Sequence, residues 1–221
     1  MFRKLFDPLG IFGGTFDPVH FGHLRLAEES IAHLGLAGVR WIPAGNPPHR
    51  DIPQVTAEQR LAMVNCATAD NSRFSVDPAE VDSQAPSYTV NSLERLRSEL
   101  GPQQPLVLLV GADAFAGLST WHRWNDILDL THVAVSHRPG FPVEISSLPS
   151  ALATQFSRRR TLDVAALKAS PGGAIVTFAM TQLAISATQI RKLLANGLSA
   201  RYLLPDGVLD YISSHSLYRN P

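Results

Sequence analysis

His20 and His23 are the residues of this chain whose types and spacing most directly suggest chemistry. They close the run Gly-Gly-Thr-Phe-Asp-Pro-Val-His-Phe-Gly-His at 13–23, between an apolar segment at 9–12 and an apolar set at helical spacing that begins at Leu24. The run therefore predicts a strand that turns into a helix. Free N–H groups at a helix start favour anions, and imidazoles three residues apart can face the same way. We expect a site for a polyphosphate.

Other interpretations of this run fit less well. A Gly-Gly pair before a helix is often a plain turn. A histidine pair could bind a metal ion, but the run has no cysteine and its one carboxylate is Asp17. The Gly-x-Gly-x-x-Gly dinucleotide fingerprint is absent, and no Walker Gly-Lys-Ser/Thr follows Gly13 and Gly14. Glycines still let the backbone approach a ligand closely, so we expect a phosphate-binding loop based on histidine.

A second run, Ile-Ser-Ala-Thr-Gln-Ile-Arg at 185–191, predicts another helix start. Ser186 is a good N-cap. An apolar helix face is expected behind it at Ile190, Leu193, Leu194 and Leu198. Thr188 and Arg191 fall in the first turn, where a hydroxyl and a guanidinium can bind an anion. Taken alone, this is an ordinary capped helix, but two such helix starts favour a triphosphate held from both ends.

The composition excludes several classes of function. The chain has 221 residues, 45% of them hydrophobic, and 19 Lys and Arg balance 19 Asp and Glu. Nucleic-acid binding needs a basic face, which zero net charge disfavours. The single cysteine, Cys66, excludes an internal disulfide and a cysteine-based zinc site, and is expected in the core. No apolar run has membrane-spanning length, and charges at Arg3, Lys4 and Asp7 interrupt any signal-peptide pattern. We therefore expect a cytoplasmic protein.

Strand-like apolar runs alternate with helical patterns along the chain. Strands are predicted at 9–12, 39–43, 74–76, 106–110, 132–136 and 174–178, and helices after 23 and at 57–69 and 88–100. This alternation predicts a parallel sheet with helices on both faces, in which ligands bind beyond the carboxyl ends of the strands. We expect a single domain over 1–221, with a variable, poorly organised connection at about 141–173. The Arg158–Arg160 run within it predicts a solvated surface.

Two loops between the signatures are candidates for binding a second substrate. After the second strand, Asn46 opens a proline-rich loop that ends in His49 and Arg50. Such a loop is often merely exposed, but its last two side chains could bind a phosphate. Ser87, in Pro-Ser-Tyr-Thr, is interpreted as the N-cap of the helix that follows.

A carboxylate and two tryptophans offer further contacts. Asp113, in Gly-Ala-Asp at 111–113, follows a buried strand, where a carboxylate commonly accepts hydrogen bonds from ribose; it could instead cap the next helix. Trp121 and Trp124 are three residues apart. Such pairs are more often core, but an exposed indole at Trp121 could stack on an aromatic ring.

The two signatures resemble the His-x-Gly-His and Ile-Ser-x-Thr-x-Ile-Arg motifs of the nucleotidylyltransferase superfamily. The order of all the runs is similar to bacterial nicotinate-nucleotide adenylyltransferases from about residue 10 to 219, and thins at about 141–173. The resemblance implies a Rossmann-like α/β fold: a doubly wound parallel sheet with helices on both faces and a small C-terminal helical part. It also implies transfer of AMP from ATP to nicotinate mononucleotide, giving deamido-NAD and pyrophosphate in NAD biosynthesis.

The resemblance implies a role for each matching residue. Catalysis is expected from His20, His23 and Arg191. ATP is expected to contact Gly13, Gly14, Thr15, Phe16, His20, His23, Gly111, Asp113, Ser186, Thr188 and Arg191. The mononucleotide is expected to contact Asn46, His49, Arg50, Tyr88, Thr89, Trp121 and Arg138. No carboxylate cluster in the sequence suggests a built-in metal site, so we expect Mg²⁺ to arrive with ATP and to be held mainly by phosphates and water. Asn91 and Ala187 depart from the common pattern, but neither has an assigned role.

Three other functions compete with this one. A transferase of the same superfamily could act on phosphopantetheine, flavin mononucleotide or glycerol phosphate instead. A binding module could sense a nucleotide without reacting. Such a module could dispense with one of His20, His23 and Arg191, so the presence of all three weighs against it. A fragment related to class I aminoacyl-tRNA synthetases would share the first motif but needs a basic tRNA-binding region. We expect ATP and nicotinate mononucleotide as partners, and neither nucleic acid nor membrane; a homo-oligomer is left open, as is any preference for nicotinate over nicotinamide mononucleotide.

Overall fold

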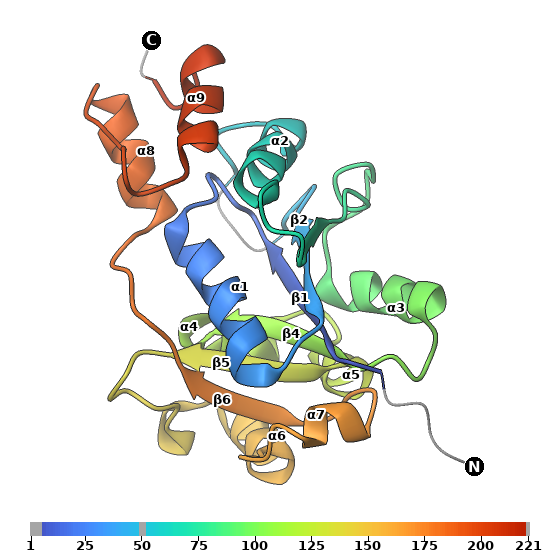
Figure 1. Cartoon of the computed structure of the whole chain (residues 1–221). Coiled ribbons are helices and arrows are strands. Elements are labelled where there is room, and N and C mark those ends of the chain that lie inside the picture. The colour runs from blue at the N-terminus through green and yellow to red at the C-terminus, as the bar shows by residue number, and fades with distance from the viewer. Residues whose placement is uncertain (1–5, 49–51, 220–221) are drawn as a thin grey trace. The chain divides into compact units, whose positions relative to one another are not determined.

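The computed structural model describes residues 6–48 and 52–219 of the chain (Figure 1). Among these residues a six-stranded sheet has the order β3-β2-β1-β4-β5-β6. Its strands are β1 (Leu9–Gly14), β2 (Gly38–Pro43), β3 (Phe74–Val76), β4 (Leu106–Gly111), β5 (His132–His137) and β6 (Ile175–Ala179). The pairs β1–β4, β4–β5 and β5–β6 are parallel. The strand order reverses between β1 and β4, as it does in doubly wound folds.

The helices alternate with the strands, and the predicted α/β class is confirmed. They are α1 (Phe21–Leu34), α2 (Ala57–Thr68), α3 (Thr89–Leu100), α4 (Ala112–Ala116), α5 (Trp124–Leu130), α6 (Ser150–Arg159), α7 (Ala166–Ala169), α8 (Ala187–Ala195) and α9 (Asp206–Ser214), with short 3-10 turns η1 (Leu118–Thr120) and η2 (Ile145–Ser147). Within residues 6–48 and 52–219, none of the helices has the length and apolar character needed to cross a membrane.

The chain divides into two compact units. Unit 1 comprises residues up to Phe12, Ala27–Val39 and Tyr88–Thr181. Unit 2 comprises Gly13–Leu26, Arg40–Ser87 and the residues from Gln182 onward. The strands β1 and β2 and the helix α1 each run from one unit into the other. The single domain over 1–221 stays a prediction.

The core of unit 1 forms around β4 and β5. Residues 106–110 of β4 and 132–136 of β5 are buried throughout, as expected of strands covered on both faces. Figure 1 shows α1 in front of these strands and α4 and α5 behind them. Near the core, the rings of Phe115 and Phe156 lie 5.6 Å apart. The continuous apolar run at 106–110 is therefore a central strand, as predicted.

The segment 141–173 is more organised than the sequence predicts. It contains η2, α6 and α7, and it buries Leu152, Phe156 and Leu167 completely. These three buried side chains anchor α6 and α7. The expectation of a poorly organised connection is therefore wrong for this part.

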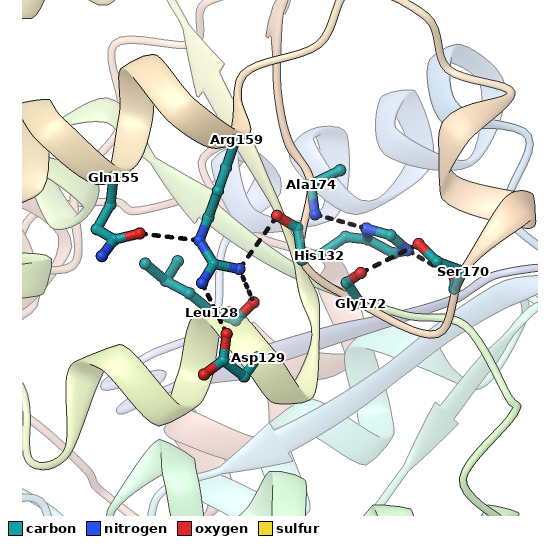
Figure 2. A network of polar contacts seen from close by, with 9 residues as sticks. Leu128, Asp129, His132, Gln155, Arg159, Ser170, Gly172 and Ala174 are labelled. Carbon is teal, nitrogen blue, oxygen red and sulfur yellow. Dashed lines mark hydrogen bonds and ion pairs between the residues drawn. The ribbon is translucent and has the colours of Figure 1, made fainter.

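Arg159 also corrects the prediction of a solvated arginine run (Figure 2). Its Nη1 donates to the carbonyl of Leu128 at 2.9 Å, and its Nη2 donates to the carboxylate of Asp129 at 2.7 Å. Its Nε donates to Gln155 at 3.0 Å. Arg158 and Arg160 are exposed, as predicted. The central arginine instead ties α6 to the end of α5.

Unit 2 has its own core around Trp41, which is fully buried. The Trp41 ring lies 5.4 Å from that of Phe16 and 5.4 Å from that of Phe74. Helix α2 packs on α9, and its start is fixed by a capping box in which Thr56 and Gln59 bond each other's backbone N–H.

Cys66 is exposed, so its predicted core position is wrong. The buried face of α2 carries Arg60, Met63, Val64 and Thr68. Cys66 stands two positions after Val64, about 200° around the helix, and therefore points away from that face. A helical pattern predicted the helix correctly but not the side of it on which Cys66 lies.

Candidate functional site

The two histidines meet at the start of α1. We call residues 13–23 the histidine loop. His20 stands immediately before Phe21, the first residue of α1, and His23 lies in the first turn. Their rings stack with centroids 3.8 Å apart and planes 27° apart. The backbone N–H of His20 donates a hydrogen bond to Nδ1 of the His23 ring at 3.3 Å. A neutral His23 therefore carries its proton on Nε2, which becomes its side-chain donor.

His20 is a buried imidazole, with 6% of its surface exposed. Burial lowers the pKa of His20 to about 4, so the ring is neutral at pH 7. Its Nδ1 is buried and has no hydrogen-bond partner in the described part of the chain. Buried polar atoms are nearly always paired. A Cβ at residue 22 would lie 3.0 Å from Cε1 and 3.0 Å from Nδ1 of His20, so Gly22 is the residue that leaves room for this ring.

The second signature contacts the first through Arg191. Ser186 is the N-cap of α8, as predicted, and accepts a hydrogen bond from the N–H of Gln189 at 3.2 Å. Nη1 of Arg191 donates to the carbonyl of Asp17 at 2.7 Å, although the two residues are 174 positions apart. Nη2 of Arg191 lies 3.4 Å from the hydroxyl of Thr188. The two runs therefore form one donor-rich cluster within unit 2, in which Arg191 is the cation.

The apolar face predicted behind Ser186 is confirmed only in part. Ile190 is fully buried and Leu193 and Leu194 are half-buried, but Leu198 is 57% exposed because α8 ends at Ala195. Ser186 and Thr188 also line a recess of about 410 Å³ along α8.

Asp17 anchors the histidine loop, of which it is part, to other segments of unit 2. It is 7% exposed, and its carboxylate accepts hydrogen bonds from the hydroxyl of Tyr218 at 2.6 Å and from the N–H of Gln54 at 3.0 Å. Nη1 of Arg191 lies 3.8 Å from the same carboxylate. Burial and the bond to Asp17 raise the pKa of Tyr218 above its ordinary value. A segment near the C-terminus thus fixes a loop near the N-terminus.

The remaining predicted residues of unit 2 are placed in different ways. Gly13 and Gly14 end β1, and Thr15 and Phe16 follow. Phe16 is 3% exposed, and its ring packs against Trp41 in the core of unit 2. His49 and Arg50 lie outside the described residues.

Asn46 is fixed by an interaction that the sequence did not predict. Its N–H donates to the hydroxyl of Ser87 at 3.0 Å, and its carbonyl accepts from the Ser87 N–H at 2.9 Å. Ser87 is therefore not the N-cap of α3; that position belongs to Tyr88, whose side chain makes no capping bond. A distant partner takes the hydroxyl that the local pattern assigned to the helix.

Unit 1 carries the other predicted residues. Gly111 ends β4 and is the N-cap of α4, so Asp113 is an exposed residue inside that helix and does not cap it. Tyr88 and Thr89 start α3, and the Tyr88 ring stacks on His122 at 4.3 Å.

Trp121 and Arg138 are both available on the surface of unit 1. Trp121 follows η1 and is half-buried, as is Trp124, so neither indole belongs to the fully buried core. Arg138 is exposed directly after β5. Part of Trp121 is therefore accessible to solvent.

Sequence reasoning missed Arg60 and Tyr218. Arg60 is 1% exposed and lies on the buried face of α2 beside Met63 and Val64. A cation on an otherwise apolar helix face is a signal that could have been noticed. Tyr218 gives no comparable signal, because its partner Asp17 is 201 positions away. In the described part of the chain, no three His, Cys, Asp or Glu side chains are grouped to hold a metal ion.

Known proteins with similar sequences agree on one family. The model of cytidylyltransferase-like proteins matches residues 11–193. A probable nicotinate-nucleotide adenylyltransferase of Dechloromonas aromatica is 79% identical over 214 residues, which cover 97% of this chain and 99% of that protein. One from Acidithiobacillus ferrooxidans is 48% identical over 221 residues, which cover 100% of both proteins.

Solved structures show the same fold. The nicotinic acid mononucleotide adenylyltransferase of Plasmodium falciparum, complexed with NaAD, has a TM-score of 0.69 and 16% sequence identity. The match covers 96% of this chain and 97% of that one. At this identity the likeness concerns the fold alone.

Proposed function

This chain belongs to the cytidylyltransferase-like family and, within it, to the nicotinate-nucleotide adenylyltransferases, and we propose that it transfers AMP from ATP to nicotinate mononucleotide. The products are nicotinic acid adenine dinucleotide and pyrophosphate. The observation that carries the proposal is the cluster in unit 2, where Arg191 of the second signature contacts the histidine loop. Its unpartnered, buried His20 Nδ1 is a hydrogen-bonding group suited to a ligand.

The chemistry requires no nucleophile from the protein. A phosphate oxygen of the mononucleotide attacks the α-phosphorus of ATP in line, and the bond from that phosphorus to the bridging oxygen of the β-phosphate breaks. Pyrophosphate leaves with that oxygen. The protein then contributes positioning and stabilisation of negative charge.

The histidines and the arginine divide this task. At pH 7 the low pKa of His20 keeps its ring neutral, so it binds phosphate by hydrogen bonding and adds no charge. His23 can donate from Nε2, because its Nδ1 faces the His20 N–H. Arg191 supplies the positive charge for the leaving pyrophosphate. Ser186 and Thr188 assist at the start of α8.

The residues of unit 1 retain the roles predicted from the sequence. Gly111 and Asp113 contact adenosine, and Trp121 stacks on the pyridine ring. Tyr88, Thr89 and Arg138 contact the mononucleotide, as does Asn46 of unit 2. Mg²⁺ enters as part of the ATP substrate, coordinated mainly by phosphates and water. A partly exposed indole at Trp121 supports an aromatic acceptor over a flexible thiol such as phosphopantetheine.

Pyrophosphate release from Mg²⁺-ATP tests the function. Nicotinate mononucleotide, nicotinamide mononucleotide, phosphopantetheine and flavin mononucleotide are offered separately as acceptors. We expect rapid release with nicotinate mononucleotide and slower release with the other three. Preferential release with phosphopantetheine would contradict the role of Trp121, and preferential release with nicotinamide mononucleotide would overturn only the choice of nicotinate. No release with any acceptor would favour a nucleotide-binding module.

A further inference from the structure

Arg60 is a fully buried cation whose contacts are with backbone carbonyls of the loops that follow two strands. Its Nη1 donates to the carbonyl of Thr15, after β1, at 2.8 Å, and also to the carbonyl of Ala44, after β2. Its Nη2 donates to the carbonyl of Gly45 at 3.1 Å. One planar guanidinium therefore ties the histidine loop to the turn that begins the Asn46 loop.

The position of Arg60 is costly for stability alone. Burial lowers its pKa, which means that the folded protein disfavours the charge, although the nearby Asp17 partly offsets this. Arg60 also lies in the first turn of α2, where the helix dipole disfavours a cation. An apolar residue of similar volume would avoid both costs. The contacts of the guanidinium therefore need another explanation.

The conformation of the histidine loop supplies that explanation. Phe16 has a φ of 50°, in the left-handed region that non-glycine residues rarely adopt. Arg60 binds the carbonyl of the peptide that joins Thr15 to Phe16. Carbonyl and N–H point in opposite directions across a trans peptide, so this bond turns the Phe16 N–H away from Arg60. The guanidinium thereby sets how the loop presents its backbone.

The second loop is fixed equally closely. A Cβ at residue 45 would lie 1.9 Å from the carbonyl oxygen of Glu80, so only glycine fits at position 45 beside that backbone. Arg60 binds the carbonyls of Ala44 and Gly45 directly before Asn46. One side chain thus sets both the loop assigned to ATP and the loop assigned to the mononucleotide.

We propose that Arg60 is a positioning residue, which holds the histidine loop and the 44–46 turn in their phosphate-binding conformation through three backbone carbonyls. The inference rests on the proposed function, because the two loops are assigned to the two substrates. Arg60 itself does not contact the reacting atoms. It acts by fixing the backbone of the two loops that are assigned to the substrates.

Arg97 provides a matched control. It is half-buried in unit 1, and it too donates only to backbone carbonyls in the contacts the structure gives: Nε to Leu130 at 2.9 Å, Nη2 to Pro171 at 2.6 Å, and Nη1 to Gln104. Burial also lowers its pKa. None of its carbonyl partners is assigned to substrate. Arg97→Lys should therefore reduce stability as Arg60→Lys does, without changing the active loops.

The experiment compares Arg60→Lys, Arg60→Met and Arg97→Lys with the parent protein, at a temperature where circular dichroism shows all four folded. Lysine keeps the charge but loses the planar fork that reaches two loops. We expect both Arg60 variants to lose about 10- to 100-fold in kcat/KM, with higher KM for both substrates, as loop displacements of about 1 Å can cause. Arg97→Lys should stay within about twofold of the parent, because its partners lie outside the substrate loops.

ATP binding measured calorimetrically without acceptor separates the two proposals. If the parent binds ATP but releases no pyrophosphate, the proposed function fails, and weaker ATP binding by the Arg60 variants would still support the positioning role. Parent-like ATP binding and kcat/KM in both Arg60 variants would overturn the inference. Equal losses in Arg60→Lys and Arg97→Lys would do the same, since they would indicate a general effect of stability.

Discussion

The burial of His20 makes the stability of this protein depend on pH. Its pKa falls from 6.5 in the unfolded chain to about 4 in the folded protein. Between these two pH values the His20 imidazole is protonated in the unfolded chain but neutral in the folded protein. The contribution of His20 to the free energy of unfolding is therefore fully present above pH 6.5 and is lost as the pH falls towards 4. At 1.36 kcal/mol per unit of pKa, the difference of about 2.5 units corresponds to about 3 kcal/mol in total. Roughly 2 kcal/mol of this should already be lost at pH 5.

Urea unfolding of the parent and of His20→Asn measures this contribution. Asparagine remains polar but does not titrate, so the variant should start less stable at pH 7 and lose about 2 kcal/mol less than the parent between pH 7 and pH 5. His122→Gln, which removes an exposed imidazole of unit 1, is the control and should follow the parent. Parallel stability curves for the parent and His20→Asn would refute the reasoning.

The same burial predicts a signature of ATP binding. A triphosphate beside His20 favours the charged imidazolium and raises its pKa. At a pH between 5 and 6, ATP binding should therefore be accompanied by uptake of a proton by the His20 imidazole. Calorimetry in two buffers of different ionisation enthalpy detects this uptake, and His20→Asn should abolish it. Uptake that persists in the variant would assign the proton to another group.

Three further substitutions test separate parts of the site. His23→Ala should lose most turnover in the pyrophosphate assay while keeping its circular dichroism spectrum; a near-normal rate would contradict its role. Trp121→Ala should raise KM for nicotinate mononucleotide without changing KM for ATP, and an equal rise in both would speak against ring stacking. Tyr218→Phe removes a hydrogen bond to the buried carboxylate of Asp17 and should cost about 1.5–3 kcal/mol in urea unfolding, whereas an unchanged midpoint would show that the bond contributes nothing.

The features that the sequence predicts correctly are those encoded by neighbouring residues. The run 106–110 predicts a buried strand because every residue in it is apolar, and β4 covers it. Ser186 predicts an N-cap because a hydroxyl before an apolar helical pattern needs only the N–H three residues later, which Gln189 supplies. The stacked rings of His20 and His23 follow from a spacing of three at a helix start.

Two of the errors come from partners that are distant in the sequence. Ser87 has the local pattern of an N-cap, but Asn46 takes its hydroxyl. Arg159 lies in a run of three arginines that predicts a solvated surface, but its guanidinium donates to the carbonyl of Leu128 and to the carboxylate of Asp129. In each case a tertiary contact competes with the local preference and wins. Local patterns predict the elements, whereas contacts between distant segments decide which side chains position the site.

The cluster of unit 2 separates hydrogen bonding from charge. A charged histidine at a phosphate site would bind substrate and product more or less tightly as the pH changed, because its ordinary pKa lies close to neutrality. Burial removes His20 from this range and leaves it a neutral donor. Arg191, which keeps its charge at any physiological pH, provides the cation and is held in place by the carbonyl of Asp17. Under the proposed function, substrate affinity near pH 7 then depends little on the protonation of His20. We infer that the anchoring of the histidine loop by Asp17 and Arg60 sets how well these donors fit a triphosphate.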